Sequence, residues 1–213
     1  MTGNRVVVTD FDGTMTGRDF FRIALDFLPA SFGSYWEEYE NGELSHFDAL
    51  AAIFAGLRCS GNAVSALLEE MTMDQGIPAA FKQLREHGWS VVVASAGCEW
   101  YIRRLLAPLG VAPVIHANPG IFIEGQGLVM QPPVGSPYFN SETGIDKAML
   151  VRDLLPRGTV VYAGDGRPDL APSLLVPPPQ RFAKGWLADE LERQGEPYVR
   201  FEHWDEIARS LTQ

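Results

Sequence analysis

Residues 5–14 read RVVVTDFDGT. The β-branched run at the start of this stretch predicts a short buried strand. Asp10 follows the strand directly, Asp12 lies two residues further on, and Gly13 allows the backbone to turn tightly. In open parallel sheets, ligands bind beyond the carboxyl ends of the strands. The stretch therefore predicts both a strand and a polar site at the end of that strand.

Strand-like and helix-like stretches alternate along the rest of the chain. Apolar patterns predict strands at 89–94, 111–116 and 159–163, a small hairpin at 121–130, and helices at 81–87, 100–109, 145–155, 186–194 and 204–211. Strands that alternate with helices are typical of a parallel sheet covered on both faces. The expected fold class is α/β: a Rossmann-like parallel sheet core with an inserted α-helical cap and a small β-hairpin.

The inserted cap is the long helical pattern at residues 18–71, for which the sequence offers no strand partner. Apolar residues recur there at helical spacing. Ser45 and Asp48 resemble a capping box at the start of a second helix in this segment. We predict that residues 17–75 form the cap and that residues 1–16 and 76–213 form the catalytic core.

Charge and composition exclude several classes of protein. The formal net charge of −10 argues against a nucleic-acid partner, although one local positive cluster is enough to hold one phosphate. No stretch approaches the roughly 20 apolar residues of a membrane span, and the first apolar run is too short for a signal peptide. Two cysteines, Cys59 and Cys98, are too few for a disulfide scaffold. We expect a cytoplasmic protein without a membrane partner, either a monomer or a homodimer.

Polar residues gather in four places at the ends of predicted elements. They are Asp10–Thr14, Ser95–Gly97, Lys147 and the sequence GDGRPD at 164–169. Three carboxylates at one sheet edge, those of Asp10, Asp12 and Asp165, would repel one another and could not all ionise cheaply. A divalent cation resolves this conflict, and oxygen ligands suit Mg²⁺. The sequence therefore predicts a magnesium site.

The remaining groups of these clusters suit phosphoryl transfer. Lys147 adds positive charge, while the Ser95 hydroxyl and the backbone N–H groups of Ala96 and Gly97 can donate to phosphate oxygens. Asp10 can then attack phosphorus as a carboxylate nucleophile and form an aspartyl-phosphate. Asp12 can serve as general acid for the leaving group and then as general base for water. These roles predict a magnesium-dependent phosphomonoester hydrolase.

The four clusters, in this order, resemble the four motifs of the haloacid dehalogenase-like phosphatases, over about residues 5–185. The resemblance implies a Rossmann-like core and Mg²⁺ bound by Asp10, Asp165 and the carbonyl of Asp12. It also implies that Asp169 either binds the metal or supports a ligand of it. Members that cleave carbon–halogen bonds lack the second acid, so Asp12 implies a phosphatase.

A helical insert after the first motif resembles the subgroup that includes phosphoserine phosphatase. Within it, the chain resembles the methionine-salvage phosphatases that act on 2-hydroxy-3-keto-5-methylthiopentenyl-1-phosphate. This similarity rests on residues 10–16 followed by Asp19, on the turn at 95–97, on the hairpin before Lys147 and on residues 182–184. Phosphoserine phosphatases usually carry Glu in place of Asp19. The resemblance implies a small phosphorylated metabolite as substrate.

Several alternatives stay open at this point. Candidates for substrate selection are Asp19, Phe20, Arg22 and Arg58, for which packing or surface roles are the alternative. Ser95 and Asp169 could merely cap helices, and Lys147 could be a surface lysine. The function could also be that of a phosphoserine phosphatase or another small-metabolite phosphatase. A phosphotransferase or phosphomutase, or a protein that binds a phosphorylated ligand without turnover, would carry similar residues.

Overall fold

A six-stranded parallel sheet forms the centre of the protein. The computed structural model describes residues 4–213, so residues 1–3 of the predicted core segment lie outside the described range. The strand order is β10-β9-β8-β1-β2-β3, and every pairing is parallel. The strands are β1 (Asn4–Thr9), β2 (Trp89–Cys98), β3 (Val114–Asn118), β8 (Gly158–Gly164), β9 (Arg181–Ala183) and β10 (Val199–Arg200).

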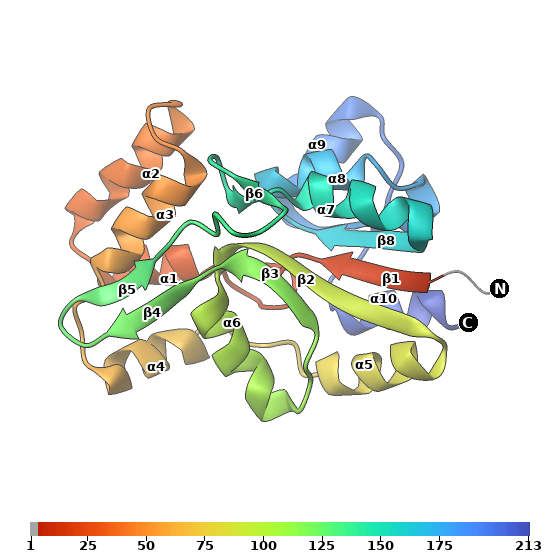
Figure 1. Ribbon diagram of the computed structural model, residues 1–213, viewed down its shortest axis with the longest axis horizontal. Coiled ribbons are helices and arrows are strands. Elements are labelled where there is room, and N and C mark those ends of the chain that lie inside the picture. The colour runs from red at the N-terminus through yellow and green to blue at the C-terminus, as the bar shows by residue number, and fades with distance from the viewer. Residues whose placement is uncertain (1–3) are drawn as a thin grey trace.

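Helices cover both faces of this sheet (Figure 1). One face carries α5 (Ile77–Glu86), α6 (Glu99–Leu106) and α10 (Asp205–Leu211), and the other carries α7 (Lys147–Leu154), α8 (Leu170–Ser173) and α9 (Gly185–Gln194). Successive residues of β1 serve the two faces, since Val7 packs in one apolar cluster and Val6 and Val8 in another. The predicted α/β class is confirmed.

Five α-helices lie between β1 and β2; α5 packs on the sheet, and the other four lie within the segment predicted to form the cap. The four are α1 (Phe20–Phe27), α2 (Gly33–Glu40), α3 (His46–Ala55) and α4 (Gly61–Glu69). These four helices lie beyond the carboxyl ends of β1 and β8 (Figure 1). A hairpin of β4 (Gly120–Ile123) and β5 (Gly127–Met130) lies beside them. Ser45 directly precedes α3 and is its N-cap residue, because its Oγ accepts a hydrogen bond from the Asp48 N–H at 3.0 Å. This is the Ser45 half of the predicted capping box; the Asp48 carboxylate accepts from Ser45 Oγ at 2.7 Å.

The chain enters and leaves this helical segment at one place. Thr16 and Met73 form an isolated bridge, and the Gly17 N–H donates to the carbonyl of Met71 at 2.9 Å. Two neighbouring connections of this kind suit an insert joined to a core. The exact division at residues 17 and 75 stays a prediction.

Some boundaries differ from the sequence prediction. β2 continues through Ser95 to Cys98, with an irregular register between Ala94 and Cys98, so Ser95 lies in the last part of the strand rather than after it. β3 begins only after Pro113, which has no N–H to donate to a strand ladder. The helix expected at 145–155 begins at Lys147, because Asp146 accepts from the Met149 N–H at 2.8 Å and caps it.

Four short strands escaped the sequence prediction. β9 and β10 extend the sheet, and β6 (Phe139–Asn140) pairs with β7 (Gly144–Ile145) just before α7. Each has only two or three residues, too few to give a periodic pattern. Single turns of 3-10 helix are η1 (Ala30–Phe32), η2 (Ala107–Leu109), η3 (Leu155–Arg157), η4 (Arg167–Asp169) and η5 (Pro178–Gln180). Across residues 4–213, no helix combines the length and the apolar character needed to cross a bilayer.

Candidate active site

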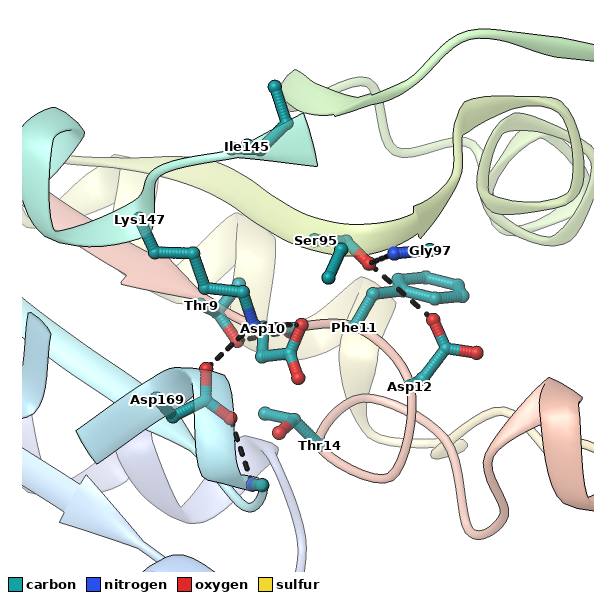
Figure 2. A network of polar contacts seen from close by, with 12 residues as sticks. Thr9, Asp10, Phe11, Asp12, Thr14, Ser95, Gly97, Ile145, Lys147 and Asp169 are labelled. Atoms are coloured by element: carbon teal, nitrogen blue, oxygen red, sulfur yellow. Dashed lines mark hydrogen bonds and ion pairs between the residues drawn. The ribbon is translucent and has the colours of Figure 1, made fainter. Parts of the chain in front are cut away.

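Asp10 stands directly beyond the end of β1 and is only 8% exposed. Its backbone N–H donates to the carbonyl of Ala163 at 2.9 Å, which holds this end of β1 against β8. The Nζ of Lys147 lies 2.8 Å from Asp10 Oδ1 and 2.7 Å from Asp169 Oδ1 (Figure 2). The Lys147 side chain is only 2% exposed, so it is not a surface lysine.

The three charges hold one another in place. Burial lowers the pKa of Lys147, but the carboxylates of Asp10 and Asp169 outweigh that effect and raise the pKa above its ordinary value. Lys147 therefore carries a fixed positive charge at the position where a phosphoryl group bound to Asp10 would carry negative charge.

Asp169 is fully buried and accepts four hydrogen bonds. Its Oδ1 accepts from Lys147 Nζ at 2.7 Å and from the Tyr162 hydroxyl at 2.5 Å. Its Oδ2 accepts from the N–H groups of Asp165 and Gly166, at 3.1 and 2.9 Å. Four donors use the whole acceptor capacity of a carboxylate. Asp169 thus positions Lys147 and the loop after β8, and it is more than a helix cap.

Carboxylate oxygens of Asp10, Asp165 and Asp169 lie within 4.8 Å of one another. Burial first, and then the charge of Asp169, raise the pKa of Asp10 well above its ordinary value and that of Asp165 to about 8. Thr14 orients Asp165 by donating from Oγ1 to Oδ1 at 2.5 Å. Buried carboxylates that ionise at such cost fit a divalent cation with oxygen ligands. Because Asp169 is already occupied, Asp10 and Asp165 are the side chains free to hold such a cation.

Asp12 turns its carboxylate away from this cluster, toward Ser95 (Figure 2). The Tyr101 hydroxyl donates to Asp12 Oδ2 at 2.8 Å, and the Phe20 N–H donates to Oδ1 at 3.2 Å. The sequence predicts a cluster of the Asp10, Asp12 and Asp165 carboxylates, but in the structure the third carboxylate is that of Asp169. The two donors explain the difference, because they hold the Asp12 side chain away from the cluster. Only the main-chain carbonyl of Asp12 is left for the metal role that the family resemblance implies.

The surroundings of Asp12 suit a proton-transfer group. Burial and then the negative charge of Asp19 raise the pKa of Asp12 to about 7, although the bond from Tyr101 lowers it. A carboxyl group with a pKa near neutrality can both donate and accept a proton at physiological pH.

The end of β2 supplies small residues and hydrogen-bond donors beside Asp10. The Gly97 N–H donates to Ser95 Oγ at 2.9 Å. The helix that follows begins after Cys98, so Ser95 is not its cap. A Cβ on Gly97 would overlap the Tyr101 hydroxyl and come within 2.7 Å of Asp12 Oδ2, so this position requires glycine.

Asn118, at the end of β3, holds this segment in place. Its Nδ2 donates to the carbonyl of Ala96 at 2.7 Å and to that of Thr143 at 3.0 Å. One buried amide thus ties the segment around Ser95 to the hairpin that leads to Lys147.

A cavity of about 350 Å³ brings the predicted groups together with residues from the cap helices. The core contributes to its lining Asp10, Asp12, Ser95, Ala96, Gly97, Tyr101, Lys147 and Asp165. The cap helices contribute Phe21, Trp36, Tyr39, His46, Leu50 and Phe54. The charged residues Asp19, Arg22, Glu40 and Arg167 also line it, together with Gly166, Pro168 and Trp186.

The four residues considered for substrate selection lie in different places. Asp19 and Arg22 line the cavity and form an ion pair at 3.5 Å. Phe20 is fully buried, with its ring centroid 4.9 Å from that of Tyr101, and packs behind the cavity wall. Arg58 is exposed and does not line the cavity.

Sequence reasoning missed Tyr101, Tyr162 and, in the cap, Trp36, Tyr39 and Phe54. Tyr101 and Tyr162 read as core residues because they sit in apolar helix and strand patterns. The hydroxyl partner of Tyr101 is 89 residues away in the sequence, and that of Tyr162 lies seven residues on, past the turn that follows β8. The dense aromatic content of residues 35–39, Tyr-Trp-Glu-Glu-Tyr, was the one available signal for the cap wall.

Comparison with known proteins agrees with this arrangement. The family model described as haloacid dehalogenase-like hydrolase matches residues 7–171. A Brevibacillus brevis protein named 2-hydroxy-3-keto-5-methylthiopentenyl-1-phosphate phosphatase is 24% identical over 100% of this chain and 97% of its own length. A Microcystis aeruginosa protein of the same name is 23% identical over 98% of each chain.

Solved structures share the fold. A phospho-aspartyl intermediate analogue of phosphoserine phosphatase matches with a TM-score of 0.69 and 16% identity, over 98% of this chain and 99% of the other. A substrate-bound phosphoserine phosphatase matches with a TM-score of 0.70, 16% identity and the same coverage. At this level of identity the likeness concerns the fold alone.

Proposed function

The chain belongs to the haloacid dehalogenase-like hydrolase family and is a phosphatase of that family, and we propose that it hydrolyses a small phosphomonoester through phosphorylation of Asp10. One observation carries this proposal: the Asp10 carboxylate lines a cavity while Lys147 Nζ lies 2.8 Å from its Oδ1. A nucleophile and a fixed positive charge at one point are what phosphoryl transfer requires.

The proposed reaction has two steps. In the first, an Asp10 oxygen attacks phosphorus, the ester P–O bond breaks, and Asp12 gives its proton to the leaving oxygen. In the second, Asp12 takes a proton from a water molecule, which attacks phosphorus and releases phosphate from Asp10. Ser95 Oγ, the Ala96 N–H and Lys147 hold the phosphoryl oxygens throughout, while the Gly97 N–H orients Ser95 by donating to its Oγ. Mg²⁺ bound by Asp10, Asp165 and the Asp12 carbonyl would neutralise charge on these oxygens.

The substrate we propose is 2-hydroxy-3-keto-5-methylthiopentenyl-1-phosphate. Both relatives that carry this name align with nearly the whole chain. The residues singled out in the sequence, among them Asp19 in place of the Glu usual in phosphoserine phosphatases, also favour it. Phosphoserine is the competing substrate within the same fold.

Metal removal tests the proposal directly. Protein treated with a chelator and then desalted should release no phosphate from any ester, and added Mg²⁺ should restore the release, because Asp10 and Asp165 ionise together only beside a cation. Free phosphate is measured with the methionine-salvage ester, phosphoserine and sugar phosphates. Hydrolysis that survives metal removal would contradict the metal assignment. Isomerised sugar phosphate in place of free phosphate would indicate a mutase, and binding without release would indicate a non-enzyme.

Replacing Tyr101 tests the proton-transfer role of Asp12. The Tyr101 hydroxyl lowers the pKa of Asp12, so Tyr101→Phe should raise that pKa and keep Asp12 protonated to higher pH. The base step needs ionised Asp12, so the acidic limb of the pH profile of kcat should move to higher pH. We expect kcat at pH 7 to fall by about tenfold, within the usual worth of acid–base catalysis.

Tyr138→Phe is the matched control for this substitution. It removes a hydroxyl that donates to a carboxylate outside the cavity, that of Asp153, at 2.7 Å. Its pH profile should stay that of the unaltered protein. Identical acidic limbs in the Tyr101→Phe variant and the control would rule out Asp12 as the titrating group.

A further inference from the structure

One side of the cavity is a wall of aromatic and aliphatic side chains from the cap helices. The rings of Phe21 and Trp36 stack with their centroids 4.0 Å apart, and that of Tyr39 lies 4.9 Å from Trp36. His46, Leu50 and Phe54 of α3 complete this surface, which we call the cap wall. Mutually packed rings form a rigid surface that costs little entropy to order when a ligand binds.

The charged side chains that line the cavity beside this wall already have partners. Arg22 pairs with Asp19 at 3.5 Å, and Arg167 lies 4.0 Å from Glu40. Both arginine side chains are more than half exposed, which places them at the rim. Among the described residues that line the cap wall, none is an unpaired cation for a substrate carboxylate or an unpaired carboxylate for an ammonium group.

His46 is the one imidazole in this wall. Its ring lies edge-on to Trp36 and Tyr39, with centroids 5.7 and 5.1 Å apart, and the residue is 8% exposed. Its Nδ1 is completely buried and has no hydrogen-bond partner. Burial lowers the pKa of His46 to about 4, so the ring is neutral at physiological pH.

The tautomer of a neutral histidine follows from the partners of its two nitrogens. Nδ1 has no acceptor to which it could donate, so the proton belongs on Nε2. Since Nδ1 is shielded, Nε2 is the nitrogen left to donate a hydrogen bond to a ligand in the cavity. A neutral N–H donor in an apolar wall selects a ligand that places an oxygen there, because a ligand lacking that oxygen leaves the donor unpaired.

We infer that the cap wall is the leaving-group pocket and that it takes an uncharged alkyl or thioether chain, with an oxygen of that chain accepting a hydrogen bond from His46. This inference rests on the proposed function, because it places the phosphate of the same ester beside Asp10. Thioether sulfur packs well against aromatic rings, so both chain types fit this surface. Phosphoserine, with a carboxylate and an ammonium group, does not fit it.

Chain length is the first test. Phosphate release in Mg²⁺ is measured for ethyl, propyl, butyl and pentyl phosphate, with phosphoserine and phosphocholine as charged competitors. Each buried methylene should raise kcat/KM about fourfold, so pentyl phosphate, with three more methylenes, should exceed ethyl phosphate by about 60-fold. Trp36→Ala should weaken the dependence of kcat/KM on chain length. Trp100→Ala also removes an indole, but one that does not line the cavity, so it should preserve the dependence. A ratio between two substrates does not depend on the folded fraction of a variant, so partial unfolding cannot mimic the result.

The second test concerns the oxygen. The unaltered protein should prefer 2-oxopentyl phosphate to pentyl phosphate by about tenfold, the worth of one hydrogen bond. His46→Phe should abolish this preference while keeping the chain-length dependence. His87→Phe, a substitution of an exposed histidine away from the cavity, should leave both unchanged. A preference that persists in His46→Phe would overturn the role of His46.

Binding separates this inference from the proposed function. The Kd of each alkyl phosphate is measured by calorimetry with the Asp10→Asn variant. This measurement does not require turnover. If no ester is hydrolysed but pentyl phosphate binds more tightly than ethyl phosphate, the proposed function fails and the pocket stands. If esters are hydrolysed without chain-length dependence, or phosphoserine is preferred, the pocket is wrong and the phosphatase stands. If neither hydrolysis nor chain-length-dependent binding occurs, both are wrong.

Discussion

Asp10→Asn should lower kcat by about 10⁴-fold or more, because an amide cannot form the acyl phosphate on which both steps depend. The substitution keeps the size and shape of the side chain. Lys147 also keeps its second partner, Asp169, at 2.7 Å. We therefore expect the variant to stay folded, with a thermal midpoint close to that of the unaltered protein.

Two measurements make this prediction specific. Phosphate release gives the loss of turnover, and acid-quenched mixing with radiolabelled ester traps phosphate on the unaltered protein but not on the variant. Asp153→Asn is the matched control, since this carboxylate lies outside the cavity and bonds to Arg157 and Tyr138. Magnesium-dependent hydrolysis at an undiminished rate in Asp10→Asn would remove Asp10 from the role of nucleophile.

Lys147→Met should lose both activity and stability. The loss of a charged donor to the phosphoryl group should lower kcat by about 10³-fold. Without Lys147, the buried carboxylates of Asp10 and Asp169 face each other with no cation between them. Leaving a buried charge unpaired lowers the free energy of unfolding by about 3–5 kcal/mol, which should be measured by denaturant unfolding in the presence of a chelator.

A surface lysine provides the comparison. Lys82 lies 4.0 Å from Glu86, and both side chains are more than half exposed. Lys82→Met should therefore change the free energy of unfolding by less than about 1 kcal/mol. If Lys147→Met unfolds at the same denaturant concentration as Lys82→Met, the charge cluster does not support the fold as argued.

Residues at strand ends were the part of the site that sequence could predict. A β-branched run followed by Asp10, and an apolar run that contains Ser95, each place a polar group at the edge where parallel strands end. Pattern alone was enough because a parallel sheet brings all such ends together. The structure indeed brings Asp10, Ser95, Lys147 and Asp165 to one cavity.

Groups that act through tertiary contacts lay beyond sequence reasoning. Tyr101 has the spacing of a core aromatic residue, and only the packing of α6 beside the end of β1 brings its hydroxyl to Asp12. The neutrality of His46 depends on its burial, which its place near the start of a helix does not indicate. The direction of the Asp12 carboxylate was likewise undetermined, because spacing fixes where a residue lies but not which donors reach it.

The central place of β1 in the sheet affects the order in which the protein matures. β1 pairs with β2 on one side and with β8 on the other, and β8 comes from the last third of the chain. Contacts between such distant segments form late, because the intervening loop must close first. A growing chain thus carries its nucleophile long before Lys147 and Asp165 exist to serve it. Catalytic competence is a late event in the biosynthesis of this protein, and an incomplete chain holds a carboxylate that it cannot yet use.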